Sequence, residues 1–249
     1  MDLVRAEKVA QLRQDILRKE GFRPTTNPLM NQVLGPLESA FPSGSFPIGV
    51  VHEFQPDEVR SGSSRAATVG FITALAAPIL AGKKVMCWIG TAGNIFPPAL
   101  MEFGVKPDQV VFVNIRKARD VLWATEEALK CSAIAAVVAE VGRLDLTASR
   151  RLQLSAEQSQ ATGFLIRSEL NSGITSSASR WRITSLESHT VDELPGVGHP
   201  HWRVELLRIR SGKPANWMVQ YRKGRFEAIS EQYDNRGVIE LKELKRSAG

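Results

Sequence analysis

Short apolar runs alternate with longer amphipathic segments along the middle of the chain. The runs are rich in Val, Ile and Ala, whereas the longer segments space their apolar residues as one face of a helix does. The strand-like runs are residues 50–54, 85–89, 110–114, 134–139 and 164–167, and the helix-like segments are residues 66–81, 118–130 and 147–160. This alternation predicts a mostly parallel sheet with helices in the crossover connections.

The pattern changes after residue 180. Residues 180–186, 202–210 and 216–222 are strand-like, and a Ser-Gly-Lys-Pro turn joins the last two as a hairpin. The run at 134–139 is instead apolar at every position, as expected of a central strand covered on both faces. We therefore predict an α/β fold, with a mostly parallel sheet flanked by helices and antiparallel strands added at its C-terminal side.

The two ends of the chain differ from this core. Residues 2–20 place Val9, Leu12 and Ile16 on one face of an amphipathic helix, and a polar linker follows. We predict an N-terminal helix and linker arm at 1–40, a core at 41–225 and a fraying tail at 226–249. The apolar helix face is a candidate partner-binding surface; the alternative is that it packs on its own domain.

Composition excludes two classes of protein. The chain has 249 residues, of which 43% are hydrophobic and 23% charged, enough for a substantial core. It contains no uninterrupted apolar run near the roughly 18 residues that a membrane span needs, and its first residues lack the apolar segment of a secretion signal. With Cys87 and Cys131 as its only cysteines, we expect a cytoplasmic protein that does not span a membrane.

Positive charge is concentrated in the last third of the chain. The formal net charge is +6, and nine positive but four negative side chains lie between Arg180 and Arg225, together with Trp181, Trp202 and Trp217. Cations interleaved with aromatic residues suit phosphate contact and base stacking, whereas the alternative is a solvated sheet face with core tryptophans. The candidate DNA-binding residues are Arg167, Arg180, Arg182, Arg203, Arg208, Arg210, Lys213, Arg222 and Lys223.

The first strand-to-helix turn is a poor nucleotide-binding loop. A phosphate loop needs glycines and a lysine, but residues 55–65 contain one glycine, and no lysine occurs between Lys19 and Lys83. Glu140, after the apolar strand, is the one acid near the Mg²⁺ side of such a site. We predict a degenerate nucleotide site without ATP hydrolysis and without a cofactor, made of Ser61, Gly62, Ser63, Ser64, Arg65 and Glu140.

Other catalytic chemistries have no support in the sequence. No Gly-x-Ser-x-Gly motif occurs, and the four histidines have no partner ligand at metal spacing. His199 and His201 form a loop pair without a third ligand, and both cysteines fit the role of small packing residues. We therefore predict no catalytic residue and no metal site.

Three segments together resemble the ImuA family of RecA-like proteins, which are associated with damage-induced mutagenesis in bacteria and are often labelled as SulA-related. These segments are residues 41–54, 122–129 and above all 144–154, with the sequence Leu-Asp-Leu-Thr-Ala-Ser-Arg-Arg-Leu-Gln-Leu. Residues 180–183 and 201–208 are similar to the late strands of the family. The resemblance extends over residues 41–222 and implies a RecA-like fold.

The resemblance to RecA also implies where its functional parts would fall. The phosphate-loop lysine of RecA has no counterpart, and Ala92 stands where its catalytic glutamate is expected. The two DNA-contacting loops of RecA would follow Glu140 and Arg167. The second loop is rich in Gly and Ser and leads directly into Arg180, so it is expected to approach a phosphate backbone closely.

The family implies a task and partners. We expect a non-catalytic adaptor in SOS-induced translesion DNA synthesis and DNA repair. Its expected partners are DNA without sequence preference, an ImuB-like polymerase-fold protein, an error-prone replicative-type polymerase and RecA, at a nucleoid-associated location in the cytoplasm. Self-association is left open. Two alternatives remain: a DNA-dependent ATPase in which Arg65 and Glu140 replace the missing groups, and a SulA-like division inhibitor that binds FtsZ.

Overall fold

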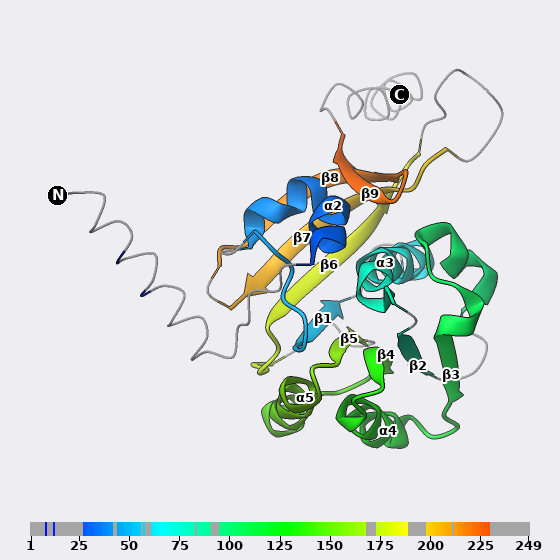
Figure 1. Cartoon of the computed structure of the whole chain (residues 1–249), viewed down its shortest axis with the longest axis vertical. Helices are drawn as coiled ribbons and strands as arrows, with labels where there is room; N and C mark the ends of the chain where they lie inside the picture. The colour runs from blue at the N-terminus through cyan, green and yellow to red at the C-terminus, as the bar shows by residue number, and fades with distance from the viewer. Residues whose placement is uncertain are drawn as a thin grey trace, which may run out of the picture.

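The computed structural model describes residues 8, 12, 27–41, 44–55, 57, 61–82, 84–90, 95–167, 173–188, 198–210 and 212–229. These residues form a nine-stranded sheet with the order β3-β2-β4-β5-β1-β6-β7-β8-β9 (Figure 1). The strands are β1 (Val51–Gln55), β2 (Val85–Gly90), β3 (Val110–Asn114), β4 (Ile134–Val141), β5 (Thr162–Arg167), β6 (Ser179–Leu186), β7 (His201–Ile209), β8 (Ala215–Arg222) and β9 (Arg225–Ala228).

The sheet confirms the predicted fold class. Strands β3, β2, β4, β5, β1 and β6 pair in parallel, and β7, β8 and β9 extend the sheet in antiparallel fashion. The helices are α2 (Pro28–Leu34), α3 (Ser61–Ala76), α4 (Ala118–Lys130) and α5 (Leu146–Ser159), with short 3₁₀ helices η1 (Gly35–Ala40), η2 (Ala77–Leu80), η3 (Pro97–Phe103) and η4 (Pro107–Gln109). Each strand-like run of the sequence corresponds to one strand. The helix-like segments correspond to α4, α5 and, for residues 66–81, to α3 with η2.

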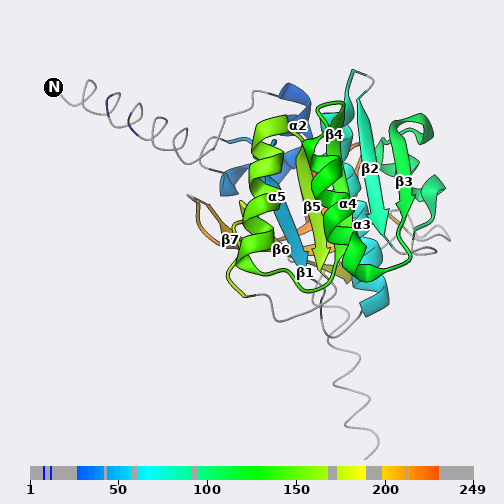
Figure 2. The ribbon, with the colours of Figure 1, turned by 90° about the horizontal axis from the view of Figure 1, so that it is seen from below.

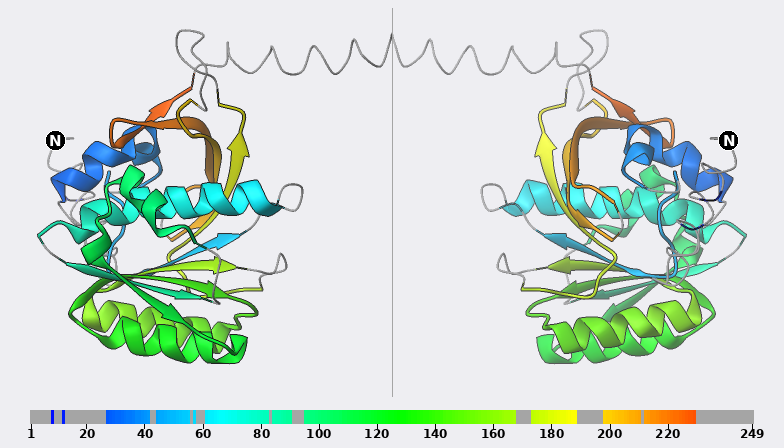
Figure 3. Two further views of the ribbon diagram at one scale, coloured as in Figure 1. Left: turned by 90° about the vertical axis from the view of Figure 1, so that its right-hand side faces the viewer. Right: turned by 90° about the vertical axis from the view of Figure 1, so that its left-hand side faces the viewer.

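Helices cover the two faces of the sheet differently. Helices α4 and α5 lie side by side on the face formed by β1, β2, β4 and β5 (Figure 2). Helix α3 lies on the opposite face, and β6, β7 and β8 arch over it (Figure 3). Helix α5 begins at Leu146 because the Asp145 side chain accepts a hydrogen bond from the Ala148 N–H at 2.7 Å.

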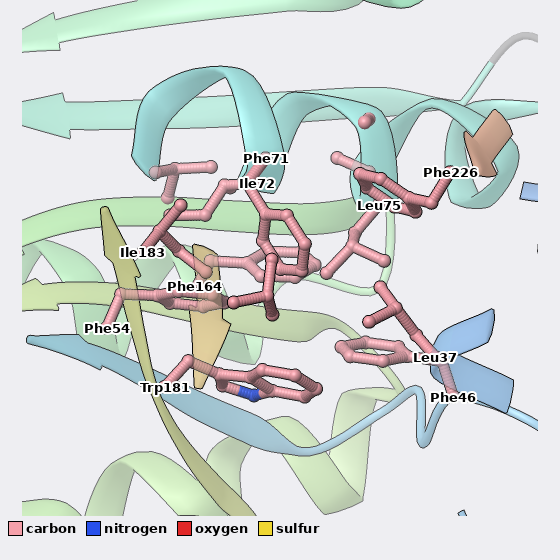
Figure 4. Packing of buried hydrophobic residues seen from close by; sticks show 14 of the residues in the cluster. Leu37, Phe46, Phe54, Phe71, Ile72, Leu75, Phe164, Trp181, Ile183 and Phe226 are labelled. Carbon is pink, nitrogen blue, oxygen red and sulfur yellow. The ribbon is translucent and has the colours of Figure 1, made fainter. Parts of the chain in front are cut away.

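The larger core lies between α3 and the curved sheet. Phe54, Phe71, Phe164 and Trp181 interlock there (Figure 4), with the Phe71 and Trp181 ring centroids 5.8 Å apart. Trp181 is fully buried and Trp202 is 3% exposed. Both tryptophans are therefore core residues, as the alternative interpretation of the basic region proposed, and their rings are not available for base stacking.

Helix α3 with η2 explains an apolar stretch. The window Ser63–Leu80 has a mean hydropathy of 1.3, which passes for a membrane span by length and composition alone. However, 72% of that window is buried inside the fold. Burial at this level is what a core helix of a sheet protein shows.

Residues 28–40 differ from the expected linker. Met30, Leu34 and Leu37 are fully buried against the core, so α2 and η1 pack on the sheet. Gly35 has φ +51°, and an added Cβ would lie 2.0 Å from the Phe226 carbonyl oxygen, so only glycine fits there. The prolines and glycine of this segment suggested a linker, but the spacing of its apolar residues is that of one buried face.

The two predicted ends are described in part. Phe226 is 1% exposed within β9, which ends at Ala228. The sheet therefore extends into the predicted tail, residues 226–249. Of the N-terminal candidates, Leu12 is helical and 54% exposed. Val9 and Ile16 lie outside the described residues, and the proposed docking role of this face stays a prediction.

Candidate functional site

The position of a nucleotide in this fold lies at the carboxyl ends of β1 and β4. Ser61 and Gly62 begin α3, Ser63 is exposed and Ser64 is buried. One turn further, the Arg65 guanidinium forms an ion pair with the Glu140 carboxylate. The Arg65 side chain is 32% exposed and the Glu140 side chain 16%. The two charged candidates of the predicted site are thus brought together.

This ion pair changes what the site can do. An arginine that neutralises a neighbouring carboxylate offers less charge to the β- and γ-phosphates of a nucleotide. The pair is also closely packed, because a Cβ added at Gly90 would lie 3.3 Å from Glu140 Cδ. Ala92 lies outside the described residues. The ATPase alternative needs both Arg65 and Glu140, and in this structure they bind each other.

A second candidate surface is the face of β6, β7 and β8 that points away from α3. Because side chains alternate along a strand, burial of Trp181 and Ile183 places Arg182 on the opposite face. Arg182 is paired across the sheet with Glu205, with the two charged groups 3.8 Å apart, and Arg203 on β7 is exposed. Helices α4 and α5 pack instead on β1, β2, β4 and β5 (Figure 2).

Three more of the predicted DNA-binding arginines hold one stretch of chain, residues 173–178. Arg180 donates to the Gly173 carbonyl and to Thr175 Oγ1, both at 3.0 Å. Arg208 donates to the Ser177 carbonyl at 2.6 Å and to its Oγ at 3.0 Å. Arg210 donates to the Ser176 carbonyl at 3.0 Å. We call Arg180, Arg208 and Arg210 the arginine clamp.

The clamped segment presents one apolar side chain. Ile174 is 81% exposed, although the neighbouring Thr175 is 3% exposed and buried. The segment is also tied to the core, because the Ala178 N–H donates to the Val51 carbonyl at 2.7 Å and the Ser176 N–H donates to Ser149 Oγ at 3.0 Å. A fixed backbone therefore supports an exposed isoleucine.

Arg167 is not placed as predicted. It is 2% exposed, and its Nη1 lies 3.6 Å from Oε2 of Glu53, which is fully buried on β1. A buried guanidinium beside a buried carboxylate cannot contact a phosphate backbone directly. The signal for Glu53 was present in the sequence, because a carboxylate stands in the middle of a short predicted strand, but its partners are more than 100 residues away.

The remaining predicted cations lie at opposite ends of β8. Lys213 is exposed in the turn before β8, and Arg222 is cross-strand from Arg225. Lys223 has φ +49° in the turn between β8 and β9 and borders a cavity of about 490 Å³ that α2 and Phe103 also line. Lys223 thus belongs to the α2 side of the molecule, away from Arg182 and Arg203.

His52 and Cys87 are buried, whereas Cys131 is exposed and does not take the packing role predicted for it. The two ring nitrogens of His52 lie 2.6 Å from Ser179 Oγ and 2.8 Å from the Pro47 carbonyl oxygen. Burial lowers the pKa of His52 to about 4, although the hydrogen bond to Pro47 acts in the opposite direction. Burial likewise raises the pKa of the Cys87 thiol to about 11. Within the part of the chain that the structure describes, no group of three or more His, Cys, Asp or Glu side chains could hold a metal ion.

Comparison with known proteins gives two kinds of match. No family model matches the chain. Two proteins from two strains of Caulobacter vibrioides, each called Protein ImuA, are 32% identical to this chain over 208 residues, which is 79% of this chain and 84% of theirs. The solved structure of SulA from Pseudomonas aeruginosa has a TM-score of 0.39 and 15% identity, and it covers 47% of this chain and 96% of that one.

Proposed function

The chain belongs to the ImuA family, and on that premise we propose that it acts in damage-induced mutagenesis as a non-catalytic, DNA-facing adaptor. The resemblance of the sequence to the ImuA family implies this role. The role would be to hold DNA and mutagenesis polymerase proteins together during error-prone translesion synthesis.

One observation carries the DNA-facing part of the proposal: the arginine-rich face of β6 and β7 adjoins an anchored segment with an exposed apolar tip. Arg182 and Arg203 lie on that face, and Ile174 is 81% exposed at the tip. Arginines supply phosphate contacts that do not depend on sequence, and an aliphatic side chain suits contact with unstacked bases. Together they favour weak, salt-sensitive binding of single-stranded DNA.

The Arg65–Glu140 ion pair supports the non-catalytic part. Catalysis of phosphoryl transfer depends on positive charge placed against the γ-phosphate and on a carboxylate that holds Mg²⁺. Here the arginine and the carboxylate neutralise each other. We therefore propose that ATP is neither required nor hydrolysed.

The protein partners follow from the family alone and remain proposals. We propose contacts with an ImuB-like polymerase-fold protein, an error-prone replicative-type polymerase and RecA, in the nucleoid region of the cytoplasm. Leu12, 54% exposed, supports a partner-facing role for the N-terminal apolar face.

The experiment that tests the proposal is a fluorescence-anisotropy titration of labelled single-stranded DNA at two salt concentrations, with and without Mg²⁺-ATP. We expect binding that weakens steeply with salt and does not change with ATP. Binding that requires ATP would contradict the non-catalytic reading. Absence of binding at low salt would remove DNA from the proposal and leave a protein-to-protein bridge. Arg150→Gln, an exposed arginine on α5 outside the proposed interface, is the matched control.

A further inference from the structure

A single buried carboxylate lies where the clamped segment joins the sheet. Strand β5 ends at Arg167 and β6 begins at Ser179, and both run parallel to β1, so the connection must return along the sheet before β6 can start. Residues 173–178 form the last part of this return. They lie between α5, through Ser149, and the start of β1, through Val51.

Glu53 connects this segment to the core through Arg180. Its Oε2 lies 3.3 Å from Arg180 Nη2 and 3.6 Å from Arg167 Nη1. The same Arg180 Nη2 donates to the Gly173 carbonyl and to Thr175 Oγ1. One guanidinium nitrogen therefore bridges a fully buried carboxylate and two acceptors of the segment.

The charges of this cluster depend on one another. Burial lowers the pKa of Arg208, the neighbouring Arg180 lowers it further, and Glu53 raises it. Glu53 thus offsets the mutual repulsion of the clamp arginines in a region with little access to water. Without the carboxylate, the arginines would favour positions further apart and closer to solvent.

We propose that Glu53 is the positioning residue of the 173–178 segment: by fixing Arg180 it fixes the segment and the direction in which Ile174 is presented. That Ile174 is presented to DNA rests on the function proposed above. In this arrangement Arg180, Arg208 and Arg210 contribute to DNA binding mainly by holding the segment, whereas Arg203 contributes charge directly.

The first test requires no DNA and therefore stands independently of the proposed function. Hydrogen exchange of the backbone amides of residues 173–179 is measured in the wild-type protein and in Glu53→Gln. We expect the variant to exchange about tenfold faster or more in this segment, because loss of the anchor raises the population of its open state. Exchange in β4, which opens only with the whole fold, reports the global loss of stability, so the change in the segment is read from amides that exchange faster than those of β4 in both proteins. Unchanged exchange in the segment of a folded variant would overturn the proposal.

The second test uses the sign of the effect on DNA affinity. Glu53→Gln raises the formal net charge from +6 by one, so a purely electrostatic role predicts tighter binding. Positioning predicts the opposite: binding about tenfold weaker, with an unchanged dependence on salt, because the segment must be ordered when DNA binds. Tighter binding by the variant would overturn the proposal.

A matched variant separates charge from position. Arg203→Gln removes an exposed arginine of the same face. It should lower the slope of log affinity against log salt by about one and leave amide exchange of the segment unchanged. If Glu53→Gln instead lowers the slope as Arg203→Gln does, the positioning role is wrong.

A second route is available if Glu53→Gln does not fold. Thr175→Val keeps the side-chain shape but removes the Oγ1 that accepts from Arg180. It should also speed exchange of residues 173–177, by a smaller factor, and weaken DNA binding without changing the salt slope. Exchange and affinity both equal to wild type would count against the proposal.

Discussion

Two glutamate–arginine clusters lie on the same sheet and differ in almost every respect. At the carboxyl end of β4, Glu140 pairs with one arginine, Arg65, and both side chains keep contact with water. In the middle of β1, Glu53 is fully buried and lies beside two arginines, Arg167 and Arg180. In the first cluster one arginine pairs with one carboxylate. The second has excess positive charge and extends to a segment at the surface.

The difference shows what the same chemistry can do in two settings. A partly exposed pair of two side chains contributes less to stability than a fully buried one, and it neutralises an arginine that could otherwise contact phosphate. A buried carboxylate with two arginines is costly to disturb, and it transmits position because its members have few alternative arrangements. The Arg65 pair thus leaves little free charge at its position, whereas the Glu53 cluster holds neighbouring chain segments in place.

The largest expected effect is on the free energy of unfolding, when the glutamate of each cluster is replaced in turn. Glu53→Gln removes the carboxylate from beside the buried Arg167 and the partly buried Arg180 and should lower the free energy of unfolding by about 3–5 kcal/mol. Glu140→Gln should lower it by less than about 1 kcal/mol. Urea denaturation followed by tryptophan fluorescence measures both.

A double variant checks the cause of this difference. Arg167→Met added to Glu53→Gln removes one of the uncompensated charges and should restore part of the lost stability. Equal destabilisation by Glu53→Gln and Glu140→Gln would remove the contrast between the clusters.

The next largest effect is the pH dependence of stability that His52, on the opposite face of β1 from Glu53, contributes. The pKa of His52 in the folded protein, about 4, is below the ordinary value of 6.5, so between these values the unfolded chain binds a proton that the folded protein does not. This contribution is complete above pH 6.5 and is lost as the pH falls towards 4, by about 3 kcal/mol in total.

Denaturant melts from pH 7 to pH 4 measure this loss. His52→Gln removes the titrating group and should flatten the pH dependence by that amount relative to the wild type. The same slope in both proteins would assign the acid sensitivity to groups other than His52.

A smaller effect concerns Arg182 and Arg203, the arginines of the proposed DNA-binding face. Replacing Arg182 and Arg203 together with Gln should weaken single-stranded DNA binding by about tenfold at low salt and reduce the salt slope by about one to two, because the contact of Arg203 is lost in full and that of Arg182, which is paired with Glu205, in part. Fluorescence anisotropy at several salt concentrations provides both quantities. An unchanged slope would make this surface a solvated face only.

The smallest effect is expected at the Arg65 pair. Arg65→Ala should change DNA affinity by less than about twofold, since its charge is already neutralised by Glu140. ATP turnover should be absent from both proteins in a phosphate-release assay. Turnover in the wild type that disappears in Arg65→Ala would reverse the comparison and establish the ATPase alternative.

Local patterns predicted most of the fold because they act within a few residues. The all-apolar run at 134–139 became the central strand β4, and the charge and apolar spacing at 118–130 became α4. Helix α2 was missed because Pro28, Gly35 and Pro36 are typical of a linker, although Met30 and Leu34 are fully buried. Its helix is stabilised by packing on the core, and this contribution is not visible in the local sequence.

The candidate site likewise has features that follow from the sequence and features that follow only from the tertiary structure. The sequence by itself determined the family resemblance, the concentration of arginines after residue 180 and the lack of a lysine in the phosphate loop, because these are properties of residue identity and spacing. Only the tertiary structure decided which arginines face solvent. Glu53 is more than 100 residues from Arg167 and Arg180 in the chain, and it is the parallel pairing of β1 with β5 and β6 that brings both guanidinium groups within 4 Å of its carboxylate. Charge is fixed by sequence, but its exposure and its partners are fixed by the pairing of distant strands.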